Sequence, residues 1–171
     1  MIKVFNSLFV TMFGLGKIKF APGTFGSLAT TIILFYLFHS INISSNIILI
    51  GLIVIFIYSF YAIFTHTENS KNKDPGEIVI DELLGQSLPI YLYEISHGTN
   101  KESGEAITYY ILFFLLFRYF DIMKPFPVNF FDKNFKNSFG VIMDDICAGL
   151  YVVLTVICFM LVKSYVSQWM F

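Results

Sequence analysis

The amino-acid sequence predicts an all-α integral membrane protein, a small helical bundle of about five hydrophobic helices with an interfacial N-terminal segment. The first observation is composition: 56% of the residues are hydrophobic and 13% are charged, against averages of roughly 45–50% and about 25%. A soluble fold of 171 residues could not hide that much apolar surface. The second is a series of long apolar runs separated by short polar segments. We expect residues 1–171 to form a single membrane domain.

The N-terminal third contains a short amphipathic segment and two candidate spans. Met1–Phe13 is expected to form a helix that lies at the membrane interface and ends at the glycines that follow it. Gly26–Ile41 is a short first candidate span, and Ile47–Phe64 is the most clearly apolar helix of the chain. The tight segment Asn42–Asn46 between them contains Ser and Asn, which commonly cap helices.

The rest of the chain contains three more hydrophobic helices. Ile78–Tyr93 is apolar but interrupted by polar residues and a proline, so we expect it to be broken or buried among other helices rather than lipid-facing. Glu105–Met123 is a further candidate span. Lys124–Phe139 is a connection rich in Pro, Phe and Lys, and Val141–Lys163 is the last helix.

The distribution of positive charge indicates an orientation. If the chain alternates across the membrane with the loop before Gly26 in the cytoplasm, most Lys and Arg residues lie on the cytoplasmic side, as the positive-inside rule requires. These cytoplasmic residues are Lys3, Lys17, Lys19, Lys71, Lys73, Arg118, Lys124, Lys133 and Lys136, whereas Lys101 and Lys163 lie outside. The net charge of −1 and the lack of a basic stripe predict no nucleic-acid partner.

Acidic residues are concentrated in three segments beside hydrocarbon: Asp74–Glu82, Phe117–Pro125 and Ile142–Gly149. A carboxylate in such surroundings is costly, so it is usually inward-facing and functional. The orientation deduced above places all three segments on the cytoplasmic side. We therefore expect them to converge on one site at that membrane surface.

Carboxylates from these segments are candidate ligands of Mg²⁺, which prefers carboxylate oxygens and binds substrate phosphates. The candidates are Asp81, Glu82, Asp121, Asp144 and Asp145. Asp144 and Asp145 are expected in the first turn of the last helix, where the helix dipole tolerates negative charge. The alternative is that these residues are ordinary interfacial charges that cap helices or form ion pairs.

Two cations accompany the carboxylates. Arg118, Asp121 and Lys124 are spaced to lie close to one helical face, and Pro125 ends that helix. Arg118 and Lys124 are therefore candidates to bind a phosphoryl group and to neutralise its charge.

The segment Ala21–Ser27 offers a second candidate for phosphate binding. Free backbone N–H groups at a helix start form an anion site, and glycine permits close approach. The candidate residues are Pro22, Gly23, Thr24 and Ser27. Alone the signal is weak, since Pro-Gly is also a common turn and Thr and Ser are common N-caps.

The remaining metal-binding and nucleophilic residue types carry little signal. His39, His66 and His97 are scattered, which indicates surface or interfacial histidines. Cys147 and Cys158 are separated by roughly 16 Å of helical rise, so they cannot form a disulfide with each other. We interpret both cysteines as inert packing residues.

Four segments together carry a family resemblance. Ala-Pro-Gly-Thr-Phe-Gly-Ser (21–27), Asp-Pro-x-x-Ile-Val-Ile-Asp-Glu-x-x-Gly (74–85), Phe-Arg-x-x-Asp-x-x-Lys-Pro-x-Pro (117–127) and Gly-x-x-x-Asp-Asp-x-x-Ala-Gly (140–149) resemble the phosphatidylglycerophosphatase A family. The resemblance implies a Mg²⁺-dependent phosphatase of the bacterial inner membrane. Its substrate would be phosphatidylglycerophosphate and its products phosphatidylglycerol and inorganic phosphate.

The mechanism expected at this site is metal-assisted attack of water on a phosphomonoester. The expected catalytic residues are Asp81, Asp121, Lys124 and Asp145, while Asp74 would cap or orient the helix that carries Asp81. Nucleophilic attack by one aspartate, forming an aspartyl phosphate, is an alternative chemistry. A small cation transporter or channel is the alternative function, and a purely structural membrane subunit would leave the acidic segments unexplained.

Overall fold

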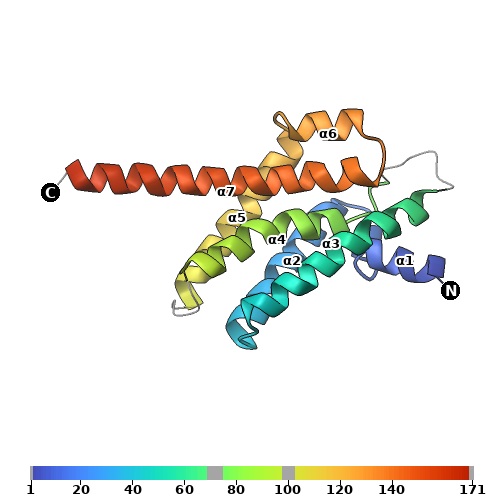
Figure 1. The fold of residues 1–171 in the computed structure, drawn as a ribbon, viewed down its shortest axis with the longest axis horizontal. Coiled ribbons are helices and arrows are strands. Elements are labelled where there is room, and N and C mark those ends of the chain that lie inside the picture. Colours follow the sequence, from blue (N-terminus) through green and yellow to red (C-terminus); the bar gives the residue numbers. More distant parts are fainter. Residues whose placement is uncertain (1, 69–74, 98–102, 170–171) are drawn as a thin grey trace.

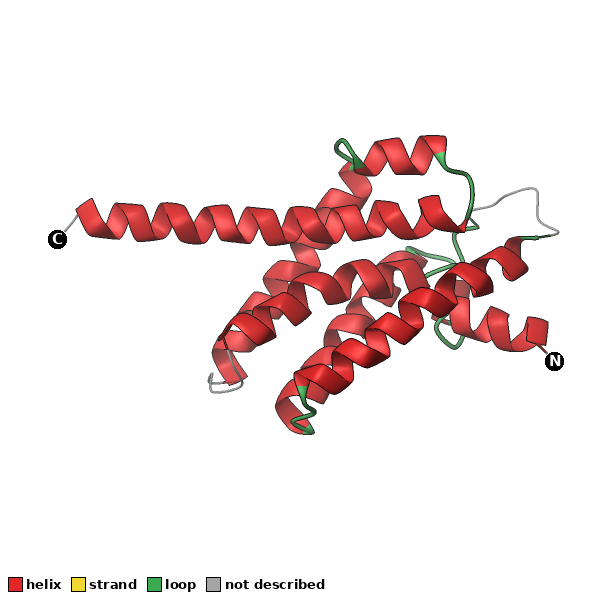
Figure 2. Ribbon diagram, in the orientation of Figure 1, coloured by secondary structure: helices red, strands yellow, loops and turns green. Residues whose placement is uncertain are grey.

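The computed structural model describes residues 2–68, 75–97 and 103–169, and among these it contains helices and no strand (Figure 2). The all-α prediction is confirmed. The helices are α1 (Ile2–Val10), the 3₁₀ turn η1 (Leu15–Lys17), α2 (Pro22–Phe35), the π-helical η2 (Tyr36–Ser40), α3 (Ser45–Thr67), α4 (Ile80–His97), α5 (Ser103–Met123), α6 (Val128–Asn134) and α7 (Ser138–Trp169).

Four helical segments of the described chain are long and apolar enough to cross a membrane: Pro22–Ser40, Ser45–Thr67, Gly104–Met123 and Ser138–Val166. The sequence predicted about five hydrophobic helices. The fifth, α4, is more polar than the others and largely buried, because it packs against α2, α3, α5 and α7. It is the central helix of the bundle (Figure 1).

Two glycines allow α4 and α7 to cross closely. A Cβ atom added to Gly149 of α7 would lie 2.3 Å from the carbonyl oxygen of Gly85 in α4. A Cβ atom on Gly85 would lie 2.5 Å from the carbonyl oxygen of Asp145. Small residues at such crossings let helix backbones approach each other closely. The resulting van der Waals contacts stabilise helix packing in lipid. This contact brings Asp145 next to the first turn of α4.

The N-terminal helix packs onto α3 through a buried polar contact. Asn6, which is 1% exposed, donates a hydrogen bond to Thr65 and accepts one from Tyr58. Elsewhere on α1, the apolar side chains of Ile2, Val4 and Phe5 are exposed. An amphipathic α1 is therefore present, and its position at the membrane interface stays a prediction.

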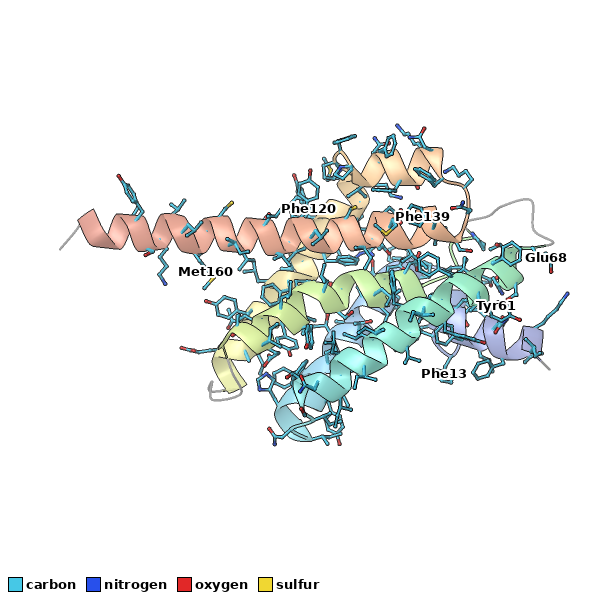
Figure 3. The ribbon with its side chains drawn as sticks, in the orientation of Figure 1. Phe13, Tyr61, Glu68, Phe120, Phe139 and Met160 are labelled. Atoms are coloured by element: carbon cyan, nitrogen blue, oxygen red, sulfur yellow. The ribbon has the colours of Figure 1, made fainter. Side chains whose placement is uncertain are left out.

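The outer surface of the bundle is apolar. Exposed side chains include Phe13, Tyr61 and Met160, which Figure 3 labels. The C-terminal part of α7 extends well beyond the other helices (Figure 1), and its side chains from Phe159 to Val162 are exposed. An exposed apolar surface of this extent is typical of a protein that contacts a membrane or another protein.

Several predicted boundaries were wrong. The helix expected from Gly26 begins at Pro22, because proline is favourable at the first helical position. The last helix begins at Ser138, so Asp144 and Asp145 lie in its second turn rather than its first. The connection Lys124–Phe139 contains the unexpected helix α6.

The α4–α7 crossing can be tested by replacing Gly149 with leucine. Gly149→Leu should lower the free energy of unfolding by about 1–3 kcal/mol, the usual cost of overpacking, because the side chain would overlap the α4 backbone. The matched control is Gly104→Leu in α5, where an added Cβ meets nothing within 4 Å. Unfolding in detergent micelles, followed by circular dichroism, measures both. Equal stability of the two variants would contradict a close crossing.

Candidate active site

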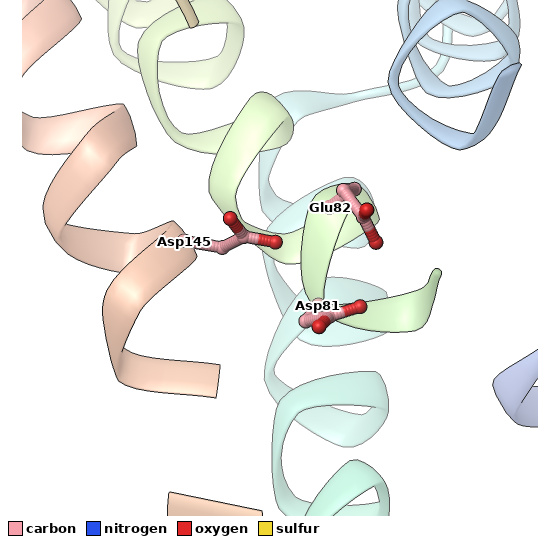
Figure 4. A group of neighbouring side chains, drawn as sticks. All are labelled: Asp81, Glu82 and Asp145. Carbon is pink, nitrogen blue, oxygen red and sulfur yellow. The ribbon is translucent and has the colours of Figure 1, made fainter. Parts of the chain in front are cut away.

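Three carboxylates, two buried and one half-buried, converge where α4 meets α7. Asp81 and Glu82 stand in the first turn of α4, and Asp145 reaches toward them from α7 (Figure 4). One carboxylate oxygen from each residue lies within 4.8 Å of the other two. Asp81 is 7% exposed and Asp145 is 3% exposed. Asp81, Glu82 and Asp145 are called the acidic triad below.

The acidic triad has the chemistry of a site for a hard divalent cation. It offers only oxygen ligands, which Mg²⁺ prefers. Asp81 Oδ1 and Glu82 Oε2 are buried and have no hydrogen-bond partner among the described residues. Three like charges this close repel one another unless a cation offsets them. A divalent cation would coordinate the unpaired oxygens and offset the repulsion between the three carboxylates.

Arg118 lies beside the triad and joins two helices. Its Nη1 atom is 2.7 Å from Asp121 Oδ2 on α5, and it donates a 3.3 Å hydrogen bond to Ser27 Oγ on α2. Asp121 in turn lies close to Asp145 of α7. A guanidinium group held in this way presents fixed donors to a phosphoryl group.

The first turn of α2 forms another wall of the site. A Cβ atom on Gly23 would lie 2.0 Å from Glu82 Oε1 and 3.2 Å from Arg118 Nη1, so a larger residue here would displace the Glu82 carboxylate. Ser27 is fully buried, and its hydroxyl donates to the Gly23 carbonyl oxygen at 2.7 Å. The structure thus brings Gly23 and Ser27 to the acidic residues.

Pro22 and Thr24 are half-buried in the same turn. No hydrogen bond joins the Thr24 side chain to the acidic triad within the described residues. The row of free backbone N–H groups expected at this helix start is shortened, because the amides of Thr24 and Phe25 both donate to the Ala21 carbonyl oxygen.

Lys124 belongs to a second, adjacent group of charges. Its Nζ atom is 2.8 Å from Asp132 Oδ1 and 3.1 Å from Asp144 Oδ2. Burial lowers the pKa of Lys124, but its hydrogen bonds to these carboxylates outweigh that effect and raise the pKa above its ordinary value. Burial raises the pKa of Asp132, but Lys124 outweighs that effect and holds it below the usual range. Both groups therefore stay charged at neutral pH.

The expectation that Arg118, Asp121 and Lys124 share the last turns of one helix was wrong for the lysine. The helix α5 ends at Met123, and Lys124 adopts the left-handed backbone conformation with φ of 44°. This turn directs Lys124 toward α6 and α7 instead of Asp121. The two groups meet through the α7 pair, since the backbone N–H of Asp145 donates to Asp144 Oδ1 at 3.0 Å.

Sequence reasoning missed two residues of this region as site residues. Asp132 is a partner of Lys124, and it lies in the connection where no helix was expected. Gln86 is fully buried in α4, and neither its amide nitrogen nor its oxygen has a hydrogen-bond partner in the described part of the chain. Asp81 was selected because it is a polar residue in an apolar helix. The same criterion applies to Gln86.

The interpretation of His39 as a surface or interfacial histidine was wrong. Its side chain is only 7% exposed, and its Nε2 atom lies 3.0 Å from Glu94 Oε1, which also accepts a hydrogen bond from Tyr110. His66 is likewise largely buried and lies 2.9 Å from Glu77. The side chain of His97 and all of Asp74 lie outside the described residues. Cys147 and Cys158 are both free, as predicted, but only Cys147 is a buried packing residue; Cys158 is exposed, so its interpretation as a packing residue was wrong.

Comparison with known proteins supports one family. The model of the family described as phosphatidylglycerophosphatase A matches residues 8–160. The chain belongs to the phosphatidylglycerophosphatase A family. A phosphatidylglycerophosphatase A of Haemophilus influenzae is 36% identical over 144 residues, which cover 84% of this chain and 82% of the relative. No solved structure matches this chain.

Two further relatives of this family member differ in the lipid that their names specify. A protein of Bacteroides thetaiotaomicron named "Putative phosphatidylinositol-3-phosphatase" is 34% identical, with 82% of this chain and 84% of the relative covered. A phosphatidylglycerophosphatase A of Escherichia coli K12 is 29% identical, with 81% of this chain and 73% of the relative covered.

The packing of Gly23 against Glu82 gives a test that needs no substrate. Gly23→Ala should displace the Glu82 carboxylate and weaken binding of Mn²⁺, used as a Mg²⁺ substitute, on the order of tenfold or more. The control is Gly76→Ala, where an added Cβ meets nothing within 4 Å. Calorimetric titration of the purified proteins with Mn²⁺ gives both affinities. Unchanged affinity in Gly23→Ala would exclude Glu82 as a ligand held by this contact.

Proposed function

We propose that this protein hydrolyses the terminal phosphomonoester of phosphatidylglycerophosphate and releases phosphatidylglycerol and inorganic phosphate. The observation that carries the proposal is the acidic triad facing Arg118 at the junction of α2, α4, α5 and α7. Clustered carboxylates next to a fixed guanidinium group suit a magnesium-dependent phosphate reaction. Membership of the family and the names of its Haemophilus and Escherichia relatives support the substrate.

Mg²⁺ would be held by Asp81, Glu82 and Asp145, with Asp121 and Asp144 as further candidate ligands around them. When bound, the metal would supply positive charge that polarises the phosphoryl group and makes a water molecule more acidic. The unpaired oxygens of Asp81 and Glu82 support these assignments.

The other residues would orient the substrate and stabilise charge. Arg118, fixed by Asp121 and Ser27, would donate hydrogen bonds to the phosphoryl oxygens. Pro22, Gly23 and Thr24 would form the wall against which the phosphate rests. Lys124, which stays protonated between Asp132 and Asp144, would add positive charge at the edge of the site.

The reaction would proceed by attack of water on phosphorus. The new bond joins the water oxygen to phosphorus, and the bond from phosphorus to the headgroup oxygen breaks. Asp121, next to Asp145, is placed to take the proton that the water loses. Asp121 would then return this proton, through solvent, to the leaving headgroup oxygen, which becomes the alcohol. Direct attack by an aspartate would instead form an aspartyl phosphate, which borohydride reduction would trap.

The site would face the cytoplasm from the bacterial inner membrane. A terminal lipid phosphate extends only into the headgroup layer, so the enzyme needs its site at that depth. The aromatic side chains around α6 support this position. Phe126 is 76% exposed and Phe130 is 44% exposed, and both would insert into lipid beside the site, together with the partly buried Phe131 and Phe135.

The cation transporter and channel alternative has no support in the family comparison. The acidic triad also lies at one end of α4, in its first turn, instead of lining a path along the bundle. A pathway would need polar groups along its length.

Removal of single charges tests the role of the triad. Asp81→Asn and Asp145→Asn keep the side-chain shape, so each should retain the fold while the rate of phosphate release falls on the order of a hundredfold or more. Lys163→Ala, at an exposed position of α7, should remain near wild type. Near-normal turnover of both asparagine variants, or full wild-type activity in excess EDTA, would reject the metal-dependent site.

The orientation can be tested by labelling single cysteines in a chain that lacks Cys147 and Cys158. A cysteine at Lys133, in α6, should react with a membrane-impermeant maleimide only from the cytoplasmic side, because the loops rich in Lys are retained there. A cysteine at Ser44, between η2 and α3, should react only from the opposite side. The reverse pattern would place the proposed site on the wrong face of the membrane.

A further inference from the structure

An apolar groove runs along the bundle between α2 and α3, with α4 as its floor. One wall is formed by the α2 face that includes Thr30 and Leu34, and the other by residues of α3 that include Gly51. Leu83 and Ser87 of α4 line the floor. The groove has a volume of about 230 Å³, and apolar side chains form most of its surface.

The groove begins next to the candidate active site. Leu83 follows Glu82 directly in the chain, and Thr30 lies three residues after Ser27, about 5 Å further along α2. From there the groove continues past Leu34 toward the end of α2. It therefore leads from the acidic triad into the apolar part of the bundle.

A second apolar groove, between α4, α5 and α7, has no such connection. Its nearest lining residue on α4 is Pro89, seven residues after Glu82, which corresponds to about 10 Å. Its lining residues on α7 begin at Val153, eight residues after Asp145. Of these two apolar grooves, the one between α2 and α3 adjoins the site.

A glycine keeps the wall of this groove open. Gly51 lies in the interior of α3, where glycine is unfavourable relative to alanine. A Cβ atom added there would meet nothing within 4 Å, so no neighbouring helix requires a glycine at this position. The missing side chain leaves space inside the groove instead.

A buried amide lies on α4 near residues of both the acidic triad and the groove. Gln86 follows Glu82 by one helical turn, and the next residue, Ser87, lines the groove. The Gln86 amide has no hydrogen-bond partner within the described ranges of the chain. Leaving such a group unpaired is costly, so it is suited to bind a polar ligand group.

We propose that the groove between α2 and α3 binds one acyl chain of the lipid substrate and that Gln86 binds the polar headgroup that joins this chain to the phosphate. The inference rests on the proposed function and extends it to a binding site for the body of a glycerophospholipid. Because the bilayer is itself apolar, the acyl chain is not removed from water when it enters the groove. Its binding is stabilised by packing contacts instead. The main benefit is that an anchored chain orients the phosphate at the triad.

Two variants that narrow the groove test the proposal. Gly51→Leu places a side chain in the wall, and Ile47→Trp enlarges an exposed side chain at its far end. Phosphate release is measured in mixed micelles with long-chain phosphatidylglycerophosphate and with a short-chain, water-soluble analogue. Each variant should lower kcat/KM for the long-chain substrate on the order of tenfold and leave the short-chain value near wild type. Ile157→Trp, in the second groove, should change neither value.

Gln86→Met, which keeps the volume of the side chain, tests the headgroup contact. It should raise KM for both substrates on the order of tenfold with little change in kcat. An unchanged KM would overturn this part of the proposal.

Several results would overturn the groove assignment. If neither variant changes the ratio of kcat/KM for the long-chain substrate to kcat/KM for the short-chain substrate, the groove does not bind the acyl chain. If Ile47→Trp lowers kcat/KM equally for both substrates, the substitution affects the reaction itself and the groove does not bind an acyl chain. If Gly51→Leu fails to fold, the result for Ile47→Trp alone tests the groove. A selective loss accompanied by altered cross-linking between copies would assign the groove to a second copy of the chain. A wild-type protein that releases no phosphate from either substrate would overturn the proposed function as well.

Discussion

The structure depends on holding three carboxylates together inside an apolar bundle. Asp81, Glu82 and Asp145 repel one another, and the burial of Asp81 and Asp145 strengthens that repulsion relative to bulk water. Two close contacts impose the arrangement. Gly85 and Gly149 let α4 and α7 cross closely enough to bring Asp145 to α4, and Gly23 lets α2 approach Glu82. Larger residues at these positions would prevent the close contacts, and the carboxylate oxygens could then move apart.

The positive groups around the triad are arranged so that they do not neutralise it completely. Arg118 pairs with Asp121, and Lys124 pairs with Asp132 and Asp144. Each cation is therefore held by carboxylates outside the triad, while Asp81 and Glu82 each keep an oxygen that has no partner among the described residues. This division leaves negative charge available for a metal and fixed donors available for a phosphate, which is the combination that phosphoryl transfer requires.

Much of the fold was accessible from the sequence because membrane helices follow simple rules. Length and hydropathy identified the long helices, and the polar interruptions of α4 correctly predicted a buried helix. The positive-inside pattern predicted that the acidic motifs lie on the same side of the membrane, which is why their convergence could be anticipated. Pro22 marked a helix start that the neighbouring glycines obscured, because those glycines serve packing against Val79 and Glu82.

The finer arrangement of the site required tertiary contacts. Periodicity placed Lys124 with Arg118, but a left-handed residue after α5 and the short helix α6 redirect it to Asp132. Similarly, His39 and Glu94 are 55 residues apart in the chain, and no local pattern pairs them. Gln86 carried a usable signal, a polar side chain in an apolar helix, although nothing local distinguishes a ligand-binding amide from a satisfied one.

The central claim is that Asp81, Glu82 and Asp145 hold the catalytic cation. The most direct measurement is a crystal structure of the protein grown with Mn²⁺, with the metal located by its anomalous scattering. The account predicts a peak within coordination distance of an oxygen from each of the three carboxylates, at about 2.0–2.3 Å. An empty triad with a peak between Asp132 and Asp144, or with no peak near α4, would contradict it.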